Sequence, residues 1–134
     1  MAEKKEIYKE LLSFAKQSVE NSYSPYSKFQ VGAAVLCQDG KVYCGTNIEN
    51  ASYGLSICAE RVAIFTAVSN GSKNIKAVAV YSKCGNVAPC GACRQVISEF
   101  SQKADIIYND KNNKIKVEKI MSLLPKSFNK QSLK

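Results

Sequence analysis

Residues 58–81 read CAERVAIFTAVSNGSKNIKAVAVY, and residues 89–108 read PCGACRQVISEFSQKADIIY. Each stretch contains a helical pattern, at 59–69 and at 90–100, in which apolar residues recur every three or four positions. Each stretch ends in a short apolar run, KAVAVY or IIY, which is typical of a buried strand. Because helix and strand alternate, the sequence predicts an α/β layer structure.

The segments on either side complete this organisation. They predict a helix, two strands of a hairpin, an edge strand and a short helix, over residues 4–20, 29–36, 41–45, 114–117 and 118–124. Asp39-Gly40 is the turn of the hairpin, and Pro125 ends the last helix. We therefore expect one domain over residues 1–134, with a three-layer α/β/α architecture and a mixed five-stranded sheet. The strand order cannot be read from these patterns.

The composition restricts both mechanism and location. The chain has six cysteines and no histidine, so mechanisms that need an imidazole base, including serine and cysteine triads, are closed to the chain acting alone. No apolar run approaches the length that spans a bilayer, and residues 1–10 have no apolar signal-peptide core. We expect a cytoplasmic protein with no membrane partner.

The net charge of +8 raises the question of nucleic-acid binding. The lysines, however, are spread over both ends of the chain with little aromatic interleaving, unlike a single-strand binding track. A solvated basic surface is the favoured interpretation, and nucleic acid is not expected as a partner.

In a reducing compartment, such cysteine spacing indicates metal or redox chemistry rather than disulfides. Cys90 and Cys93 form a Cys-x-x-Cys motif at the start of one predicted helix, and Cys58 and Glu60 stand at the start of the preceding one. Three thiolates leave the fourth tetrahedral position of a zinc ion open for water, which is typical of a catalytic site. The alternatives are a thioredoxin-like redox pair, a buried structural pair, and a closed zinc site with Cys84 as fourth ligand.

Charged residues flank the predicted ligands. Three thiolates make a zinc site formally anionic, so Arg61 and Arg94 are candidates to restore the Lewis acidity of the ion; ordinary surface arginines are the alternative. Glu60 in a first helical turn also complements the helix dipole, but its position two residues after Cys58 favours a catalytic role.

Together these motifs resemble the zinc-dependent cytidine deaminase family, in which Cys/His-x-Glu is joined to Pro-Cys-x-x-Cys. The chain is similar to the small homotetrameric branch in four segments that occur in the same order. They are YSKFQVGA at 26–33, NIENA at 47–51, CAER at 58–61 and PCGACRQ at 89–95. The resemblance implies a cytidine deaminase-like fold.

The resemblance also implies a reaction: hydrolytic deamination of free cytidine and deoxycytidine to uridine and deoxyuridine, with release of ammonia, in pyrimidine salvage. Cys58, Cys90 and Cys93 would bind one zinc ion per chain. Glu60 would move a proton from the attacking water to ring N3 and then to the leaving amine.

Further residues acquire roles from the resemblance. Asn47 and Glu49 would hydrogen-bond the ribose, Phe29 would pack against the base, and the Ala59 amide would meet the base carbonyl. Without the family, the favoured interpretations are that Phe29 is part of a strand core and that Asn47 and Glu49 are solvated loop residues. Phe128 would reach a neighbouring subunit's pocket in a homotetramer, although Lys126-Ser127 precede it where the family has Gly-Ala.

Three rival functions stay open: a polynucleotide-editing deaminase, an antibiotic-nucleoside deaminase of the blasticidin type, and a non-enzymatic zinc-stabilised binding module. Cysteine rather than histidine at position 58, the short chain, and Asn47 with Glu49 favour a free nucleoside as substrate. Packing as small apolar residues is the default for Cys37, Cys44 and Cys84.

Overall fold

The computed structural model describes residues 2–133. In chain order its elements are α1 (Ala2–Ser18), β1 (Val31–Cys37), β2 (Val42–Thr46), α2 (Ala59–Ser69), β3 (Ile75–Ser82), α3 (Gly91–Phe100), β4 (Asp105–Asn109), β5 (Ile115–Lys119) and α4 (Ile120–Leu123). Three short 3₁₀ helices span Val19–Asn21, Tyr53–Leu55 and Lys130–Leu133. None of the helices in this part of the chain combines the length and the apolar character needed to cross a membrane.

The five strands form one mixed sheet in the order β2-β1-β3-β4-β5. β3 and β4 are parallel, and the other neighbouring pairs are antiparallel. A parallel pair needs a crossover connection, and α3 provides it between β3 and β4. The predicted mixed five-stranded sheet is therefore confirmed.

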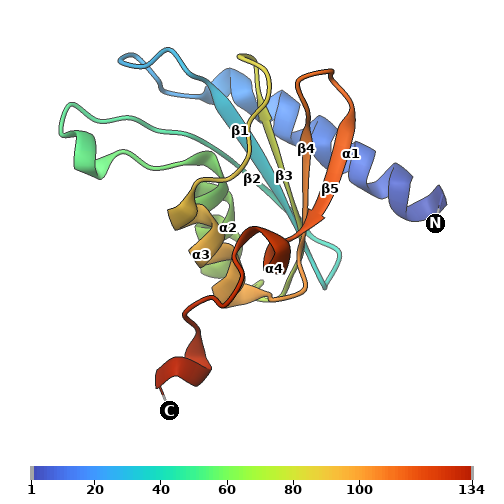
Figure 1. The fold of residues 1–134 in the computed structure, drawn as a ribbon. Helices are drawn as coiled ribbons and strands as arrows, with labels where there is room; N and C mark the ends of the chain where they lie inside the picture. The colour runs from blue at the N-terminus through green and yellow to red at the C-terminus, as the bar shows by residue number, and fades with distance from the viewer. Residues whose placement is uncertain (1, 134) are drawn as a thin grey trace.

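Helices cover both faces of the sheet (Figure 1). Side chains of β1 alternate between the faces, as the pleat requires: Val31, Ala33 and Val35 join the core beneath α2 and α3, whereas Ala34 and Leu36 pack beneath α1. The predicted three-layer α/β/α architecture is confirmed, and its two cores lie on opposite faces of the sheet.

Gly45 in β2 allows α2 to lie very close to the sheet. A Cβ atom at this position would stand 2.4 Å from the Ala63 nitrogen and 2.8 Å from the Ala59 carbonyl oxygen. Only a residue without a side chain leaves room for such an approach. The contact places the first turn of α2, and with it Glu60, against the end of the hairpin.

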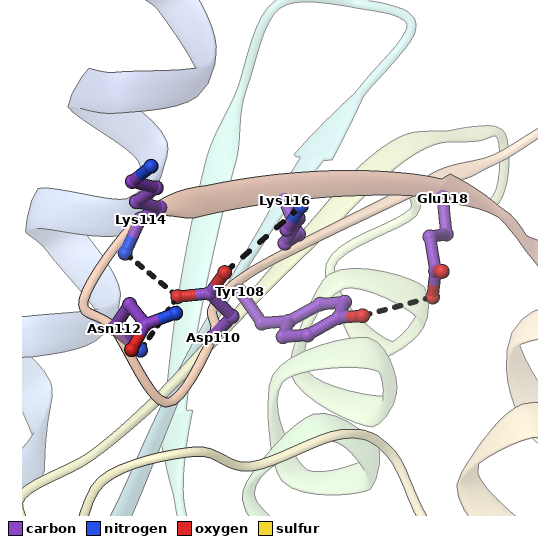
Figure 2. A network of polar contacts seen from close by, with 6 residues as sticks. All are labelled: Tyr108, Asp110, Asn112, Lys114, Lys116 and Glu118. Atoms are coloured by element: carbon purple, nitrogen blue, oxygen red, sulfur yellow. Dashed lines mark hydrogen bonds and ion pairs between the residues drawn. The ribbon is translucent and has the colours of Figure 1, made fainter.

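The boundary between β5 and α4 differs from the prediction. Residues 118 and 119 belong to the strand rather than to the predicted helix, because both pair with β4. Glu118 accepts a hydrogen bond from the Tyr108 hydroxyl at 3.0 Å (Figure 2), and the Lys119 ammonium lies 2.6 Å from Asp105. These partners are distant in sequence, so the local helical pattern did not reveal them.

The β4–β5 turn is held by Asp110 (Figure 2). Its carboxylate accepts hydrogen bonds from the backbone N–H groups of Asn112 and Lys114, at 2.8 and 3.0 Å, and lies 3.9 Å from the Lys116 ammonium. The lysines of this edge strand also discourage pairing with a strand of another chain.

Asp105 joins three elements at the base of the sheet. Its buried carboxylate accepts a hydrogen bond from the Tyr8 hydroxyl on α1 and lies 3.4 Å from the Lys4 ammonium, in addition to the contact with Lys119 on β5. Burial alone would raise the pKa of Asp105, but the bonds from Lys119 and Tyr8 outweigh it and hold that pKa below its ordinary value.

We expect Asp105→Asn to lower the free energy of unfolding at pH 7 by about 1–3 kcal/mol, because the variant loses the charge that binds the two lysines and Tyr8. The loss stays within this range because both lysines are half exposed and screened by water. The folded-state pKa is the lower one, so this contribution is present above the unfolded pKa of about 4 and is lost as the pH falls through the folded value. Urea unfolding at several pH values from 7 to 3 measures this. The difference in free energy of unfolding between Asp105→Asn and wild type should shrink as the pH falls, and the exposed control Glu99→Gln should unfold with nearly the wild-type free energy throughout. A difference that is constant with pH would contradict the role of the charge.

Candidate metal centre and active site

Three thiols meet where α2 and α3 begin. Cys58 is the N-cap of α2, Cys90 is the N-cap of α3, and Cys93 lies in the first turn of α3. Their sulfur atoms all lie within 4.8 Å of one another, and those of Cys58 and Cys90 are 3.8 Å apart. Tetrahedral zinc with sulfur ligands at about 2.3 Å separates them by about 3.8 Å. The cluster therefore fits one zinc ion.

The other cysteines stay outside this cluster. All six, each within the described residues, are free. The Cys84 sulfur lies 3.9 Å from the Lys28 carbonyl oxygen and does not join the three thiols. The geometry thus offers three protein ligands and argues against the closed site that Cys84 would complete.

The pKa values of Cys58 and Cys93 are shifted in opposite directions. Hydrogen bonds from Cys93, and then from Arg61, whose Nη2 lies 3.5 Å from the sulfur, lower the pKa of Cys58 to about 5. The pKa of Cys93 is raised, because its proton is held by the Cys58 thiolate and its side chain is buried. The Cys90 sulfur accepts the Cys93 backbone N–H at 3.4 Å. Donors at the start of a helix favour sulfur ligation.

Glu60 lies in the first turn of α2, next to the thiols, and is only 3% exposed. Burial, with a further contribution from the Cys58 thiolate, raises its pKa to about 7. Among the described residues, a buried carboxyl beside a candidate metal centre is the group best suited to proton transfer.

A cavity of about 440 Å³ opens in front of these groups. Its size is typical of small-molecule sites. From the predicted set it is lined by Phe29, Asn47, Glu49, Cys58, Ala59, Glu60 and Cys90. The fold therefore brings the predicted substrate-binding residues of the hairpin region to the same cavity as the thiols and Glu60.

Asn47 is held rigidly at the end of β2. Its Oδ1 accepts hydrogen bonds from the Val31 backbone N–H at 3.0 Å and from the Ser22 hydroxyl, and its Nδ2 donates to the Phe29 carbonyl at 2.7 Å. It is thus an ordered part of the cavity wall, not a solvated loop residue.

Residues 5–109 match the family model described as the cytidine and deoxycytidylate deaminase zinc-binding region. The chain belongs to this deaminase family. A cytidine deaminase of Sporosarcina psychrophila is 46% identical over 125 residues, which cover 92% of each chain. One of Halalkalibacterium halodurans is 45% identical over 125 residues, or 92% of this chain and 95% of the relative.

The fold of the family is confirmed by a solved structure. The crystal structure of cytidine deaminase from Burkholderia pseudomallei superimposes with a TM-score of 0.82 at 43% identity, covering 88% of this chain and 96% of that one. Zinc is the cofactor of this deaminase family member, since the matched region is a zinc-binding one and the three thiols fit the ion.

The two arginines of this deaminase family member differ in what they touch. Arg61 contacts the Cys58 sulfur directly. Arg94 does not reach a thiol; it donates from Nε to the Pro89 carbonyl at 2.8 Å and from Nη1 to the Leu123 carbonyl at 2.9 Å. It therefore ties the segment that precedes Cys90 to α4.

Several cavity residues of this deaminase were missed by sequence reasoning. Ser27, Val31, Ser56, Ile57, Val87 and Ala88 also line the cavity. Ser27 and Val31 fall within the first similar segment, which was a usable signal. The others lie in loops whose approach to the cavity depends on tertiary contacts. Phe29, which was predicted to begin a strand, precedes β1 instead.

Phe128 does not line the cavity of its own chain. Its side chain is 61% exposed, and its carbonyl accepts a hydrogen bond from Gln95 Nε2 at 2.8 Å. Its contact with a neighbouring subunit stays a prediction.

Proposed function

We propose that the chain deaminates free cytidine and deoxycytidine by hydrolysis, yielding uridine or deoxyuridine and ammonia, as a step of pyrimidine salvage. One observation carries this proposal: the thiol cluster, Glu60 and the pair Asn47 and Glu49 line or adjoin a single cavity. Relatives named cytidine deaminase, matched over 92% of this chain, support it.

In this proposal Cys58, Cys90 and Cys93 hold one zinc ion per chain, and Arg61 offsets part of their negative charge. When bound, the ion supplies Lewis acidity, which provides hydroxide from water at neutral pH. The buried Glu60 takes one proton from the attacking water and delivers it to ring N3, and then takes the proton of the new C4 hydroxyl and delivers it to the departing amine. Water adds at C4, the bond from C4 to the amino nitrogen breaks, and ammonia leaves.

The base is recognised by an apolar wall and a helix end. Phe29 packs against the ring face, which a planar base prefers. The backbone N–H of Ala59, the first residue of α2, has no acceptor within its own helix, so it is available to the base carbonyl. These contacts orient C4 toward the thiol cluster.

The sugar is recognised by Asn47 and Glu49. Of the two Nδ2 hydrogens of Asn47, one is donated to the Phe29 carbonyl, and the other remains for a ribose oxygen. The Glu49 carboxylate accepts from ribose hydroxyls. A donor and an acceptor side by side suit a sugar better than a phosphate backbone.

We also propose that the chain forms a homotetramer as a single-domain subunit, with Phe128 reaching a neighbouring cavity. The exposed aromatic and aliphatic side chains Tyr53, Leu55 and Phe128 support association. Free thiols and a thiolate zinc site are suited to a reducing compartment, so we place the protein in the cytoplasm.

A polynucleotide substrate is disfavoured by the charge distribution. Lys4, Lys83, Lys116 and Lys119 are engaged with carboxylates and are therefore less available to phosphates. Along the sequence, the remaining lysines show little of the aromatic interleaving that is typical of a single-strand binding track.

The test follows the ultraviolet absorbance of cytosine during incubation of zinc-assayed protein with cytidine, deoxycytidine, blasticidin S, and single-stranded DNA and RNA in separate reactions. We expect loss of the cytosine band with both nucleosides, with about one zinc per chain, and no change with the polymers. Intact, zinc-loaded protein that leaves both nucleosides unchanged would refute the proposal, and preferred turnover of blasticidin S would move the chain to the antibiotic-nucleoside class.

A further inference from the structure

Ser27 lies between the two residues that we place against the base and the sugar. Its hydroxyl donates to Glu49 Oε2 and accepts the Phe29 backbone N–H at 3.0 Å. A serine hydroxyl has one donor and two acceptor lone pairs, so this single group joins both neighbours. Ser27 also lines the cavity itself.

The backbone of the same segment adds two more donors to Glu49. The N–H groups of Tyr26 and Ser27 both reach Oε1, at 3.0 and 3.1 Å. Lys28 adopts φ of 62°, a left-handed conformation that is uncommon outside glycine, and its N–H donates to the Ser24 carbonyl at 3.1 Å. This tight turn returns the chain so that the Phe29 N–H meets the Ser27 hydroxyl.

These contacts keep the Glu49 carboxylate ionised and fix its orientation. The hydrogen bond from Ser27 is the main reason that the pKa of Glu49 lies below its ordinary value. Oε1 is occupied by two backbone donors, whereas Oε2 carries only the Ser27 hydroxyl. The free lone pair of Oε2 is therefore the acceptor that a sugar hydroxyl can use, and the Ser27 hydroxyl sets its direction.

We propose that Ser27 is a positioning residue for sugar recognition, which acts by holding the Glu49 carboxylate toward the ribose hydroxyls of the substrate. The inference rests on the proposed function, in which Glu49 accepts from the ribose. Preorganised groups lower the cost of ordering a site when the substrate binds, so removal of the hydroxyl mainly weakens the sugar contact that depends on Glu49. The Phe29 N–H loses an acceptor as well, which affects substrates with and without ribose hydroxyls alike.

The test compares kcat/KM for cytidine and for 2′,3′-dideoxycytidine, which lacks both ribose hydroxyls, in the zinc-loaded enzyme. Ser27→Ala should lower kcat/KM for cytidine about 10- to 30-fold, mainly through KM, and for dideoxycytidine less than about threefold. Ser27→Thr, which keeps a hydroxyl, should recover cytidine turnover to within about threefold. Ser27→Cys, with only a weak donor, should behave like Ser27→Ala.

Two further variants separate the possible failures. Ser13→Ala removes an exposed hydroxyl on α1 and should match wild type. Glu49→Gln should show the same selectivity for cytidine over dideoxycytidine as Ser27→Ala. Suppose that Glu49→Gln loses kcat/KM selectively for cytidine, whereas Ser27→Ala loses it equally for both substrates or not at all. That result would overturn the proposed role of Ser27 but not the sugar contact of Glu49. Equal losses in Glu49→Gln would overturn the sugar contact of the proposed function as well.

Discussion

Glu60→Gln is expected to lower the turnover of cytidine by about 10²- to 10⁴-fold, the range that a positioned acid–base group contributes. The amide has the size of the carboxyl but cannot accept and return a proton, so both proton transfers fail. The variant should keep its zinc and its melting temperature, because Glu60 is not one of the three thiol ligands. Absorbance assays at high enzyme concentration, zinc analysis and a thermal melt of the same sample measure these three properties.

The matched control is Glu99→Gln, which makes the same chemical change at an exposed position on α3 and should leave turnover near wild type. If Glu60→Gln retained wild-type turnover, the proposed mechanism would be wrong. If it lost zinc together with turnover, Glu60 would belong to the metal centre rather than to proton transfer.

Cys90→Ala is expected to reduce bound zinc from about one per chain to below about one-tenth, with turnover lost in parallel, since two thiolates hold the ion poorly. Cys90 is also the N-cap of α3, where its sulfur accepts the Cys93 N–H. Loss of such a cap lowers stability by about 1 kcal/mol. In Cys90→Ala, a loss of stability caused by the missing cap could therefore be mistaken for one caused by the missing zinc.

Cys90→Ser separates the two effects, because the hydroxyl keeps a capping acceptor but is a poor zinc ligand. It should lose zinc while it keeps most of the helix stability in the metal-free state, as measured by elemental analysis and by thermal melting in a chelator. Cys84→Ala and Cys44→Ala should retain zinc. Stoichiometric zinc in Cys90→Ala would overturn the ligand assignment, and zinc loss in Cys84→Ala would restore the closed structural site.

Local patterns predicted most of the elements that carry the site. The helix at 59–69 agrees with α2 (Ala59–Ser69), because its apolar spacing and the following Asn70-Gly71 are both local signals; Gly71 indeed has φ of 89°. Strand order was beyond such reasoning. The parallel pairing of β3 with β4 joins segments separated by a whole helix. The first residues of the predicted helix at 118–124 belong to β5 instead, because they pair with β4 across the β4–β5 turn.

The amino-acid sequence by itself pointed to the chemistry: three thiols and a carboxyl at two helix starts, in a chain without histidine, favoured a zinc centre with an open position over a redox pair or a closed site with Cys84. Only the tertiary structure decided the wall of the cavity. Asn47 and Glu49 are ordered by Ser22 and Ser27, residues more than twenty positions away, and Arg94 turned out to tie a loop to α4. The physical reason is that each short motif, Cys58-x-Glu60 or Cys90-x-x-Cys93, can be recognised from local spacing. The approach of the two motifs across 32 positions, like the direction of a polar side chain, depends on partners that folding alone brings near.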